Sequence, residues 1–492
     1  MKGSVAGGSE VAVDAGLYAL RQGGNAVDAV IAAQLAATVS EPVLTGLCGA
    51  GIALLHSPKK SISIDMFATH PGLDSYFPHS LDKITINFGP TSQDFSIGLG
   101  SIATPSLWKG ILFLHENFAT LPLQVLAEPA ISAAKNGVNL SKTIAYVLDI
   151  LWPICSYTQE IREMLSVANN KLSAGDIFYA PTMVADLQDF VQNRHEFLHT
   201  GRIGESFWKL LHQKSSLSVT DIEQYTIHVR SPYEATCGSA RVLLPSAPSI
   251  GAQYVLRNIE KLHGNNTLEH QLVAMNTTLQ EMNRENIIKI FNKTDEPWDI
   301  PDFSEISAGF TSHISVIDED GLSIGLTSSL GESCGYVIPN TGLILNNFLG
   351  ESDVCPDFVA GQVGKRLLTM CCPTIATNTD STVVLGSGGS SRIRTAILYT
   401  LMNRFINNMS LNESIHAPRI HLEPEIIQLE RCGQPENIQE RMLATPGCSK
   451  HKLEYFEQLS MFFGGVHAVQ KHKSDFEAVG DIRREGIGKV QD

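Results

Sequence analysis

One threonine follows a polar segment and opens a strand-like run, which places it well to act as a nucleophile. Thr311 begins the sequence TSHISVID after the proline-containing stretch 292–309. A threonine hydroxyl is a weak nucleophile and needs a base within hydrogen-bond reach. If the bond before Thr311 were cut, its freed α-amine, with a pKa of about 7.7–8, would suit that task. Taken alone, a threonine here is more often structural, because threonine favours strands.

A glycine-rich loop supplies the second possible piece of chemistry. The sequence LGSGGSSRI at 385–393 joins a strand-like run to a helix. Backbone N–H groups at such a junction, together with the helix dipole, attract an anion and can stabilise the oxyanion of acyl transfer. A phosphate cradle is the competing function, but no Lys-Ser/Thr pair follows the glycines. A plain tight turn is the structural alternative.

The elements around these residues are strands that lead into turns or helices. Residues 311–327 predict a hairpin that turns at Asp320-Gly321. Val383–Leu385 predicts a strand that enters the glycine loop, and a helix follows from Arg392 to about Asn403. The polar stretch 292–309 predicts an exposed loop.

The N-terminal region predicts two helices and a strand. The first helix runs from Val11 to Gln22 and stops at Gly23-Gly24, and Asn25 is a good N-cap for the second. The second helix has apolar residues at helical spacing and ends at Pro42 before a strand at Ile52–Leu55; these apolar residues are Val27, Val30, Ile31, Leu35 and Val39. Such a helix, rich in small residues, is expected to be buried against a sheet.

The middle of the chain, about 107–283, is predicted to be mostly helical. It includes an amphipathic segment at 121–135. Thr220 and Glu223 have the spacing of a capping box.

Composition and charge exclude several classes of function. The net charge of −15 over 492 residues, with no dense Lys/Arg tract, argues against a nucleic-acid partner. The apolar stretch 26–39 is too short and polar to span a bilayer, and no secretory signal is visible at the N-terminus. Nine cysteines show no metal-ligand spacing. We therefore expect a cytoplasmic protein with reduced thiols, without a metal or organic cofactor and without a membrane partner.

Long blocks in one order identify a relationship. They are GGNAVDAVIAAQLAATVSEP (23–42), GSIATPSLWKGILFLHENFATLPLQVLAEPAISAAKNG (100–137), SVTDIEQYTIHVRSPY (218–233), PSAPSIGA (245–252), TSHISVIDEDG (311–321), TGLILNN (341–347), GKRLLTMCCPTI (364–375), LGSGGSSRIRTAIL (385–398) and VGDIRREG (479–486). In these blocks the chain resembles the γ-glutamyltransferase (glutathione hydrolase) family nearly end to end. Several blocks in order are far more specific than any one motif.

The resemblance implies an α+β fold, the four-layer αββα sandwich of N-terminal-nucleophile hydrolases. It also implies that the chain cuts itself at Phe310–Thr311. Residues 1–310 would become a large subunit and 311–492 a small one, and the two would stay associated in one αββα domain. Thr311 would then be the nucleophile, and Thr311-Ser312-His313 stands where the family has Thr-Thr-His.

The remaining catalytic and substrate-binding positions follow from the same resemblance. Ser329 falls where the family places a hydroxyl beside the nucleophile, and Gly389 and Ser390 fall on the two oxyanion donors. The substrate-binding positions depart from the family in several places; they are Phe67 for an arginine that binds the substrate carboxylate, Gly331 for an asparagine, Phe348 and Glu351 for residues that hold the α-amino group, and Thr369-Met370 for a serine pair. Glu351 could still pair with an ammonium. Arg366, Arg392 and Arg394 could meet a carboxylate from another direction, but we interpret them as structural.

Three functional hypotheses follow. The preferred one is a γ-glutamyltransferase-like hydrolase or acyltransferase that attacks a γ-glutamyl, glutathione-type amide through an acyl-enzyme on Thr311. The first alternative is an amidase for a less polar acyl group, held by Phe67, Phe348 and Met370. The second is a catalytically silent paralogue that acts as a binding protein. The retained hydroxyls of Thr311 and Ser329 favour an enzyme, which would act on a small-molecule amide or peptide.

Overall fold

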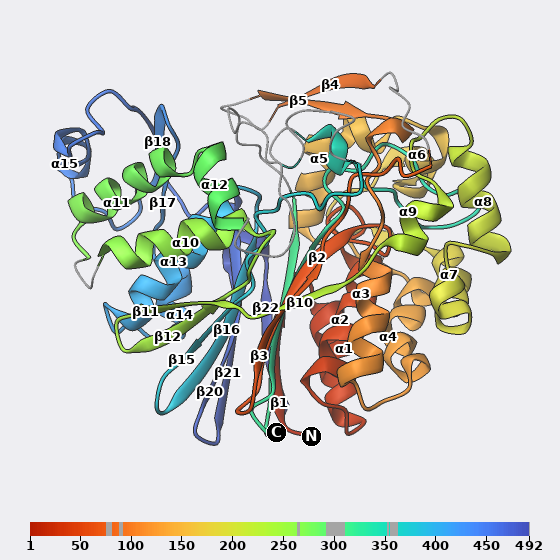
Figure 1. Ribbon diagram of the computed structural model, residues 1–492, viewed down its shortest axis with the longest axis horizontal. Coiled ribbons are helices and arrows are strands. Elements are labelled where there is room, and N and C mark those ends of the chain that lie inside the picture. Colours follow the sequence, from red (N-terminus) through yellow and green to blue (C-terminus); the bar gives the residue numbers. More distant parts are fainter. Residues whose placement is uncertain are drawn as a thin grey trace.

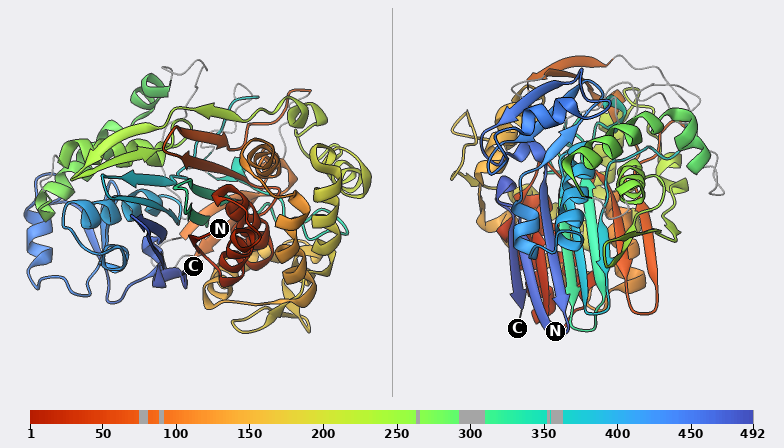
Figure 2. Two further views of the ribbon diagram at one scale, coloured as in Figure 1. Left: turned by 90° about the horizontal axis from the view of Figure 1, so that it is seen from below. Right: turned by 90° about the vertical axis from the view of Figure 1, so that its left-hand side faces the viewer.

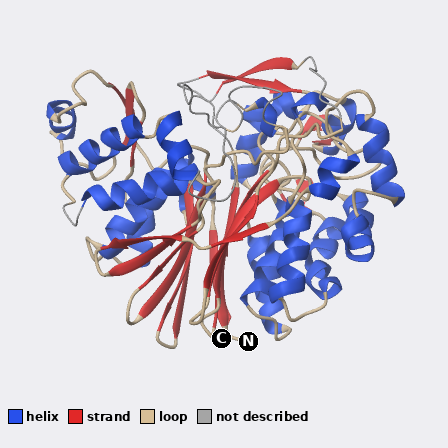
Figure 3. Cartoon of the chain, in the orientation of Figure 1, coloured by secondary structure: helices blue, strands red, loops and turns tan. Residues whose placement is uncertain are grey.

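Two β-sheets lie face to face at the centre of the protein, and helices cover the outer side of each (Figure 1, Figure 3). The computed structural model describes residues 1–74, 81–87, 92–262, 266–291, 310–351, 354 and 363–491. The order of layers is helix, sheet, sheet, helix, which confirms the predicted αββα sandwich.

The first sheet has seven strands in the order β10-β3-β2-β14-β13-β1-β22. Its strands are β1 (Gly3–Gly7), β2 (Ala50–His56), β3 (Ser61–Met66), β10 (His228–Arg230), β13 (Ser312–Asp318), β14 (Ser323–Ser329) and β22 (Ile487–Gln491). All neighbours are antiparallel. Because β22 pairs with β1, the two chain ends lie close together, as Figure 1 and Figure 2 show.

The second sheet has six strands in the order β11-β12-β15-β16-β20-β21, again antiparallel. Its strands are β11 (Tyr233–Cys237), β12 (Ala240–Leu244), β15 (Thr374–Thr377), β16 (Ser381–Gly388), β20 (Gly465–His472) and β21 (Asp475–Gly480). A buried apolar cluster fills the space between the sheets; it contains Ala6, Leu54, Leu243, Ile317, Ile375, Val384 and Val469. Ile314 and Val316 of β13 instead join the core on the helix side, as the alternation of a strand requires.

Helices α1 (Glu10–Arg21) and α2 (Ala26–Ser40) cover the first sheet, and α3 (Leu107–Phe118) also contacts β2 and β3. Helix α4 (Leu123–Asn136) packs on the outside of α1 and α2. Every residue of α2 is buried, which explains its run of alanine and β-branched residues. Asn25 caps α2 through a capping box with Asp28. The Ala26 N–H donates to Asp318 in the turn of the β13–β14 hairpin, over 2.9 Å, and so fixes the helix to the hairpin.

Helices α10 (Ile250–Leu262) and α13 (Arg392–Phe405) cover the second sheet. The remaining helices are α5 (Lys142–Cys155), α6 (Gln159–Met164), α7 (Pro181–Asn193), α8 (Gly201–Leu211), α9 (Val219–Gln224), α11 (Leu268–Glu281), α12 (Arg284–Phe291), α14 (Leu411–His416) and α15 (Ile438–Ala444). Among the described residues, no helix combines the length and the apolar character needed to cross a membrane. The eight cysteines in this part of the chain are free thiols.

The N-terminal helices, the hairpin at 311–327 and the strand, loop and helix at 383–403 form as predicted. The predicted capping box of Thr220 and Glu223 is wrong. Ser218 is the N-cap of α9, and Asp221 completes the box because its carboxylate accepts the Ser218 N–H. The same carboxylate also accepts the N–H groups of Gly72 and Leu73. The predicted exposed loop at 292–309 lies outside the described residues.

Candidate active site

Thr311 and Ser329 lie opposite each other at the open end of the β13–β14 hairpin. The pairing of Ser312 with Ser328 places them there. The Ser329 Oγ donates to the carbonyl oxygen of Phe310 over 2.9 Å and accepts the Gly331 N–H over 2.9 Å. The hydroxyl that the family resemblance places beside the nucleophile therefore contacts the carbonyl of the bond predicted to be cut.

Residue 310 is held on both of its backbone polar groups. Its N–H donates to Oε1 of Glu332 over 3.0 Å, while Ser329 holds its carbonyl. Phe310 itself is 5% exposed. A carbonyl fixed in this way keeps one orientation relative to the adjacent Thr311, and intramolecular attack requires such a fixed orientation.

The glycine-rich loop packs directly onto Thr311. A Cβ on Gly388, the last residue of β16, would lie 2.0 Å from the Thr311 carbonyl oxygen, so only glycine fits there. Gly389 and Ser390 follow with φ of 117° and 47°. For a residue other than glycine, the left-handed backbone conformation of Ser390 costs roughly 1 kcal/mol of conformational free energy. Ser390 thus adopts a backbone conformation that glycine takes without this cost, and α13 begins two residues later.

Two buried groups lie behind Thr311. The Ser312 hydroxyl donates to Glu41 over 2.7 Å, and burial raises the pKa of that carboxyl above its ordinary value. His313 is hydrogen-bonded to Thr327 and Ser315, each over 2.8 Å. Burial lowers the pKa of His313 well below its ordinary value, so the ring is neutral and its role is packing between the sheets.

A small cavity of about 30 Å³ lies in front of Thr311. Eight of the ten predicted site residues line it; they are Thr311, Ser329, Ser390, Phe67, Phe348, Glu351, Thr369 and Met370. Its wall also includes residues that sequence reasoning missed, namely Phe310, Val354, Cys371 and Ile393. The rings of Phe67 and Phe348 lie 5.1 Å apart and make one wall apolar. In the uncut chain the cavity has room for about one water molecule.

Gly331 and Gly389, the other two predicted residues, lie just outside this lining. A Cβ on Gly331 would lie 1.8 Å from Oε1 of Glu351 and 2.2 Å from Oδ1 of Asn347. The space that the family's asparagine would need is thus filled by two other side chains. Any side chain at 331 would therefore clash with Glu351 and Asn347 in their present positions.

The three arginines predicted to be structural are all engaged. Arg366 donates to the carbonyl of Phe67 over 2.6 Å and lies 3.1 Å from Asp65. Arg394 pairs with Glu423 over 3.0 Å. Arg392 lies over the ring of Phe462, 4.1 Å from its centroid.

A fourth arginine, Arg484, was missed by sequence reasoning and lies at the site itself. Its guanidinium packs on Gly388 and Gly389 and faces the ring of Phe310, 6.0 Å from the ring centroid. Only its place in the VGDIRREG block pointed to it, and that block does not reveal its distance to residue 310.

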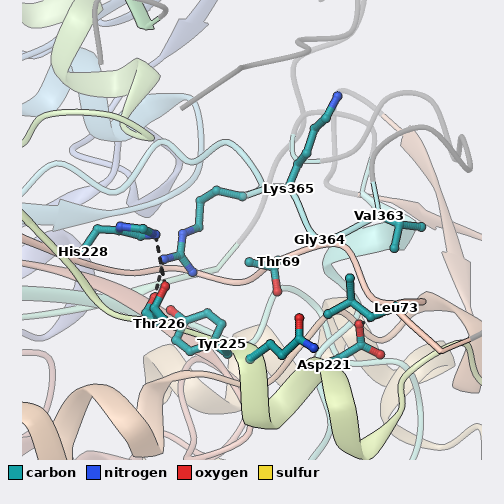
Figure 4. Close-up of a pocket in the computed structure, with 11 residues that line it drawn as sticks. Thr69, Leu73, Asp221, Tyr225, Thr226, His228, Val363, Gly364 and Lys365 are labelled. Carbon is teal, nitrogen blue, oxygen red and sulfur yellow. Dashed lines mark hydrogen bonds between the residues drawn. The ribbon is translucent and has the colours of Figure 1, made fainter. Parts of the chain in front are cut away.

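A larger cavity of about 330 Å³ lies behind Phe67 (Figure 4). Thr69, Asp221, Tyr225 and Lys365 are among the residues lining it. Tyr225 and Arg366, which also lines it, both donate to the Phe67 carbonyl and so form the wall between the two cavities. This cavity is larger than the one in front of Thr311, but neither Thr311 nor Ser329 is among the residues that line it.

Comparison with known proteins identifies the family of this chain. The chain matches the family model described as gamma-glutamyltranspeptidase over residues 12–284 and 269–490. The chain belongs to the gamma-glutamyltranspeptidase family. It is a hydrolase or acyltransferase of the type of this family.

Two relatives of this gamma-glutamyltranspeptidase family member illustrate the range. Glutathione hydrolase proenzyme 1 of Schizosaccharomyces pombe is 26% identical, over 88% of this chain and 76% of its own length. Acylase ACY 1 proenzyme of Pseudomonas sp. is 24% identical, over 95% of this chain and 89% of its own. The cephalosporin acylase structure from Bacillus halodurans has a TM-score of 0.81 at 18% identity, covering 99% of this chain and 95% of that one. That likeness concerns the fold.

Proposed function

We propose that this protein is a self-activating threonine amidase of the γ-glutamyltransferase type. It cuts its own Phe310–Thr311 bond and then uses the Thr311 hydroxyl to take acyl groups from small amides. The observation that carries the proposal is the hydrogen bond from Ser329 to the Phe310 carbonyl, directly beside Thr311. Two relatives are named proenzymes, which supports an activating cut.

The cut proceeds in two steps. The Thr311 hydroxyl oxygen adds to the Phe310 carbonyl carbon, and the Ser329 hydroxyl donates to the developing oxyanion. The C–N bond breaks, the nitrogen takes a proton, and an ester joins Phe310 to Thr311. Water then hydrolyses this ester, leaving a carboxylate on Phe310 and a free α-amine and hydroxyl on Thr311.

The mature enzyme repeats this chemistry on other amides. The α-amine of Thr311 serves as the base, because its pKa of about 7.7–8 allows it to accept the hydroxyl proton at neutral pH. The N–H groups of Gly389 and Ser390 and the start of α13 stabilise the oxyanion. The acyl-enzyme ester is released by water or by an amine acceptor.

The acyl specificity differs from that of a typical γ-glutamyltransferase. Phe67 and Met370 replace side chains that would bind a carboxylate, and Phe348 lies against Phe67. Each charge-assisted hydrogen bond lost costs roughly 1.5–3 kcal/mol of binding. The second candidate, an amidase for a less polar acyl group, is favoured by this apolar wall. A panel of γ-glutamyl and plain acyl anilides separates the two candidates.

The first experiment is an intact-mass measurement of the purified protein. We expect fragments of 310 and 182 residues that begin at Met1 and Thr311. Thr311→Ala should give one band on a denaturing gel, because the attacking oxygen is gone. A wild-type chain that stays whole through prolonged incubation would show that the proposed function is wrong and would favour the silent paralogue.

A further inference from the structure

Residue 310 is the first acyl group that Thr311 takes under the proposed function, and three contacts hold it in place. Its N–H donates to Oε1 of Glu332 over 3.0 Å. Its carbonyl oxygen accepts the Ser329 hydroxyl over 2.9 Å. Its ring centroid lies 6.0 Å from the Arg484 guanidinium, which is the range of a cation–π contact. The three contacts meet the three substituents of one α-carbon, namely the nitrogen, the carbonyl and the side chain.

One turn supplies both of the backbone contacts. Ser329 is the last residue of β14, and Glu332 follows three positions later, after Gly331 with a φ of 68°. The Ser329 oxygen accepts the Gly331 N–H, and the Asn347 side chain accepts the Glu332 N–H over 2.9 Å. Glu332 is 1% exposed. The turn is therefore fixed at both ends, and it directs a hydroxyl and a carboxylate onto the same residue.

The ester formed during self-cleavage is chemically an α-aminoacyl enzyme. It joins the Phe310 carbonyl to the Thr311 oxygen, and its α-carbon carries a nitrogen and a benzyl group. Under the proposed function, water hydrolyses this ester once in every molecule before the enzyme matures. The site thus has to hold and deacylate an L-phenylalanyl group, and residue 310 has to leave before another acyl group takes the same place.

The lining of the cavity in front of Thr311 suits an acyl group with an amine and an apolar side chain. Phe67, Phe348 and Ile393 give it apolar walls. Among the described residues that line it, none is a lysine or an arginine. A carboxylate on the acyl group would therefore meet no cation in this lining, whereas an ammonium placed where the Phe310 N–H lies would meet the carboxylate of Glu332.

We propose that the mature enzyme hydrolyses amides of aromatic L-α-amino acids, with the substrate ammonium held by Glu332 and its ring facing Arg484. This inference rests on the proposed function and names its acyl group. The Thr311 hydroxyl oxygen adds to the aminoacyl carbonyl carbon, and the Thr311 α-amine takes the hydroxyl proton. The C–N bond breaks, the leaving amine takes this proton, and water hydrolyses the ester to release the amino acid. An ammonium on a carboxylate forms a stronger hydrogen bond than the neutral N–H that Glu332 accepts in the uncut chain.

Four p-nitroanilides form the test: L-phenylalanyl, D-phenylalanyl, 3-phenylpropanoyl and L-alanyl. The last three each change one recognised feature, namely the handedness, the ammonium and the ring. We expect the kcat/KM of the mature wild type to be roughly 10- to 100-fold higher for L-phenylalanyl than for 3-phenylpropanoyl, because the latter lacks one charge-assisted hydrogen bond. D-phenylalanyl and L-alanyl should also be slower than L-phenylalanyl, by roughly 10-fold or more.

Glu332→Gln separates the charge at this position from its shape. The glutamine oxygen still accepts the Phe310 N–H, so this chain should still cut itself, but it has no charge to pair with an ammonium. The kcat/KM ratio of L-phenylalanyl to 3-phenylpropanoyl should therefore fall close to one. Glu234→Gln, which neutralises an exposed carboxylate paired with Arg241, is the matched control and should keep the wild-type ratio.

Calorimetry is a second test, which needs neither turnover nor a variant at Glu332. The mature wild type should bind L-phenylalaninol at least about 10-fold more tightly than 3-phenylpropan-1-ol, which lacks the amine. The uncut Thr311→Ala chain should bind neither alcohol, because residue 310 fills the site.

Equal wild-type rates for L-phenylalanyl and 3-phenylpropanoyl would overturn the inference, as would equal binding of the two alcohols. A ratio that survives in Glu332→Gln but is lost in Glu351→Gln would also overturn it, because the ammonium would then lie at the other carboxylate. Failure of the proposed function is seen separately, as a wild-type chain that remains uncut, and the inference then fails with it.

Discussion

The Ser329 hydroxyl donates to the carbonyl of residue 310, so the fold places a hydrogen-bond donor on the bond that we propose is cut. Its oxygen also accepts the Gly331 N–H, which fixes its orientation. Removing one hydrogen-bond donor that is already positioned on a developing oxyanion slows a reaction by about 10²–10³-fold.

We therefore expect Ser329→Ala to slow self-cleavage by about 10²-fold, because the Phe310 carbonyl loses its donor. The time course of fragment appearance on a denaturing gel measures this. Ser329→Thr keeps the hydroxyl and should cleave at a rate much closer to wild type. If the alanine variant cleaves at the wild-type rate, Ser329 is not an oxyanion donor.

At this scale the ordered resemblance predicted ten site residues, and eight of them line one cavity. It did not reveal that Glu351 fills the space beside Gly331, because the two residues are 20 positions apart and no local pattern links them. Arg484 was missed for the same reason. It lies 173 positions after Thr311 in the chain, and the pairing of β21 with β20 and of β20 with β16 brings the two together.

At the scale of elements, the close approach of β16 to the start of β13 sets the geometry of the site. Gly388 allows the loop to touch the Thr311 carbonyl. The helix α2, whose last turn leads to Glu41, supports β13 from the other side.

Gly388→Ala should therefore abolish or strongly slow self-cleavage, because its Cβ would lie 2.0 Å from the Thr311 oxygen and 2.9 Å from Arg484. Overpacking of this kind also costs roughly 1–3 kcal/mol of stability. Fragment yield and urea unfolding measure the two effects. Gly433→Ala is the control, since Gly433 has a left-handed backbone but no neighbour near its Cβ position. Normal cleavage by Gly388→Ala would contradict this account of the loop.

Helices and strands were predicted well where one periodicity dominates. The buried α2 and the β13–β14 hairpin are examples, since apolar spacing and an Asp-Gly turn specify them locally. The start of α9 was predicted wrongly because two hydroxyl residues compete as N-cap. Tertiary hydrogen bonds from Gly72 and Leu73 to Asp221 decide in favour of Ser218.

At the scale of the whole molecule, burial of titratable groups makes stability depend on pH. Burial lowers the pKa of His421 and His467 to about 4 in the folded protein. The unfolded chain takes up these protons near pH 6.5, whereas the folded protein does not. Stability is therefore unaffected by these two groups above pH 6.5 and falls as the pH decreases toward 4.

Between pH 7 and pH 5 we expect a loss of roughly 1–2 kcal/mol for each of these histidines. Urea unfolding of the uncut Thr311→Ala chain at both pH values measures it. His421→Gln should reduce the loss, because the glutamine cannot titrate. A pH dependence unchanged by this substitution would show that His421 does not titrate as proposed.

The strand order has a consequence for the refolding of the protein before and after the proposed cut. β13 and β14, from one side of the proposed cut, lie between β2 and β1 from the other side. Before the cut, these neighbours are tied in one chain, and folding is unimolecular. After the cut, the two separate fragments of a denatured sample must find each other by diffusion, and refolding is bimolecular. We expect the Thr311→Ala chain to regain its structure after dilution from urea at a rate independent of concentration. The cut protein should refold slowly, at a rate that rises in proportion to protein concentration. Once the chain is cut, its sequence alone is therefore no longer enough to restore the structure after denaturation.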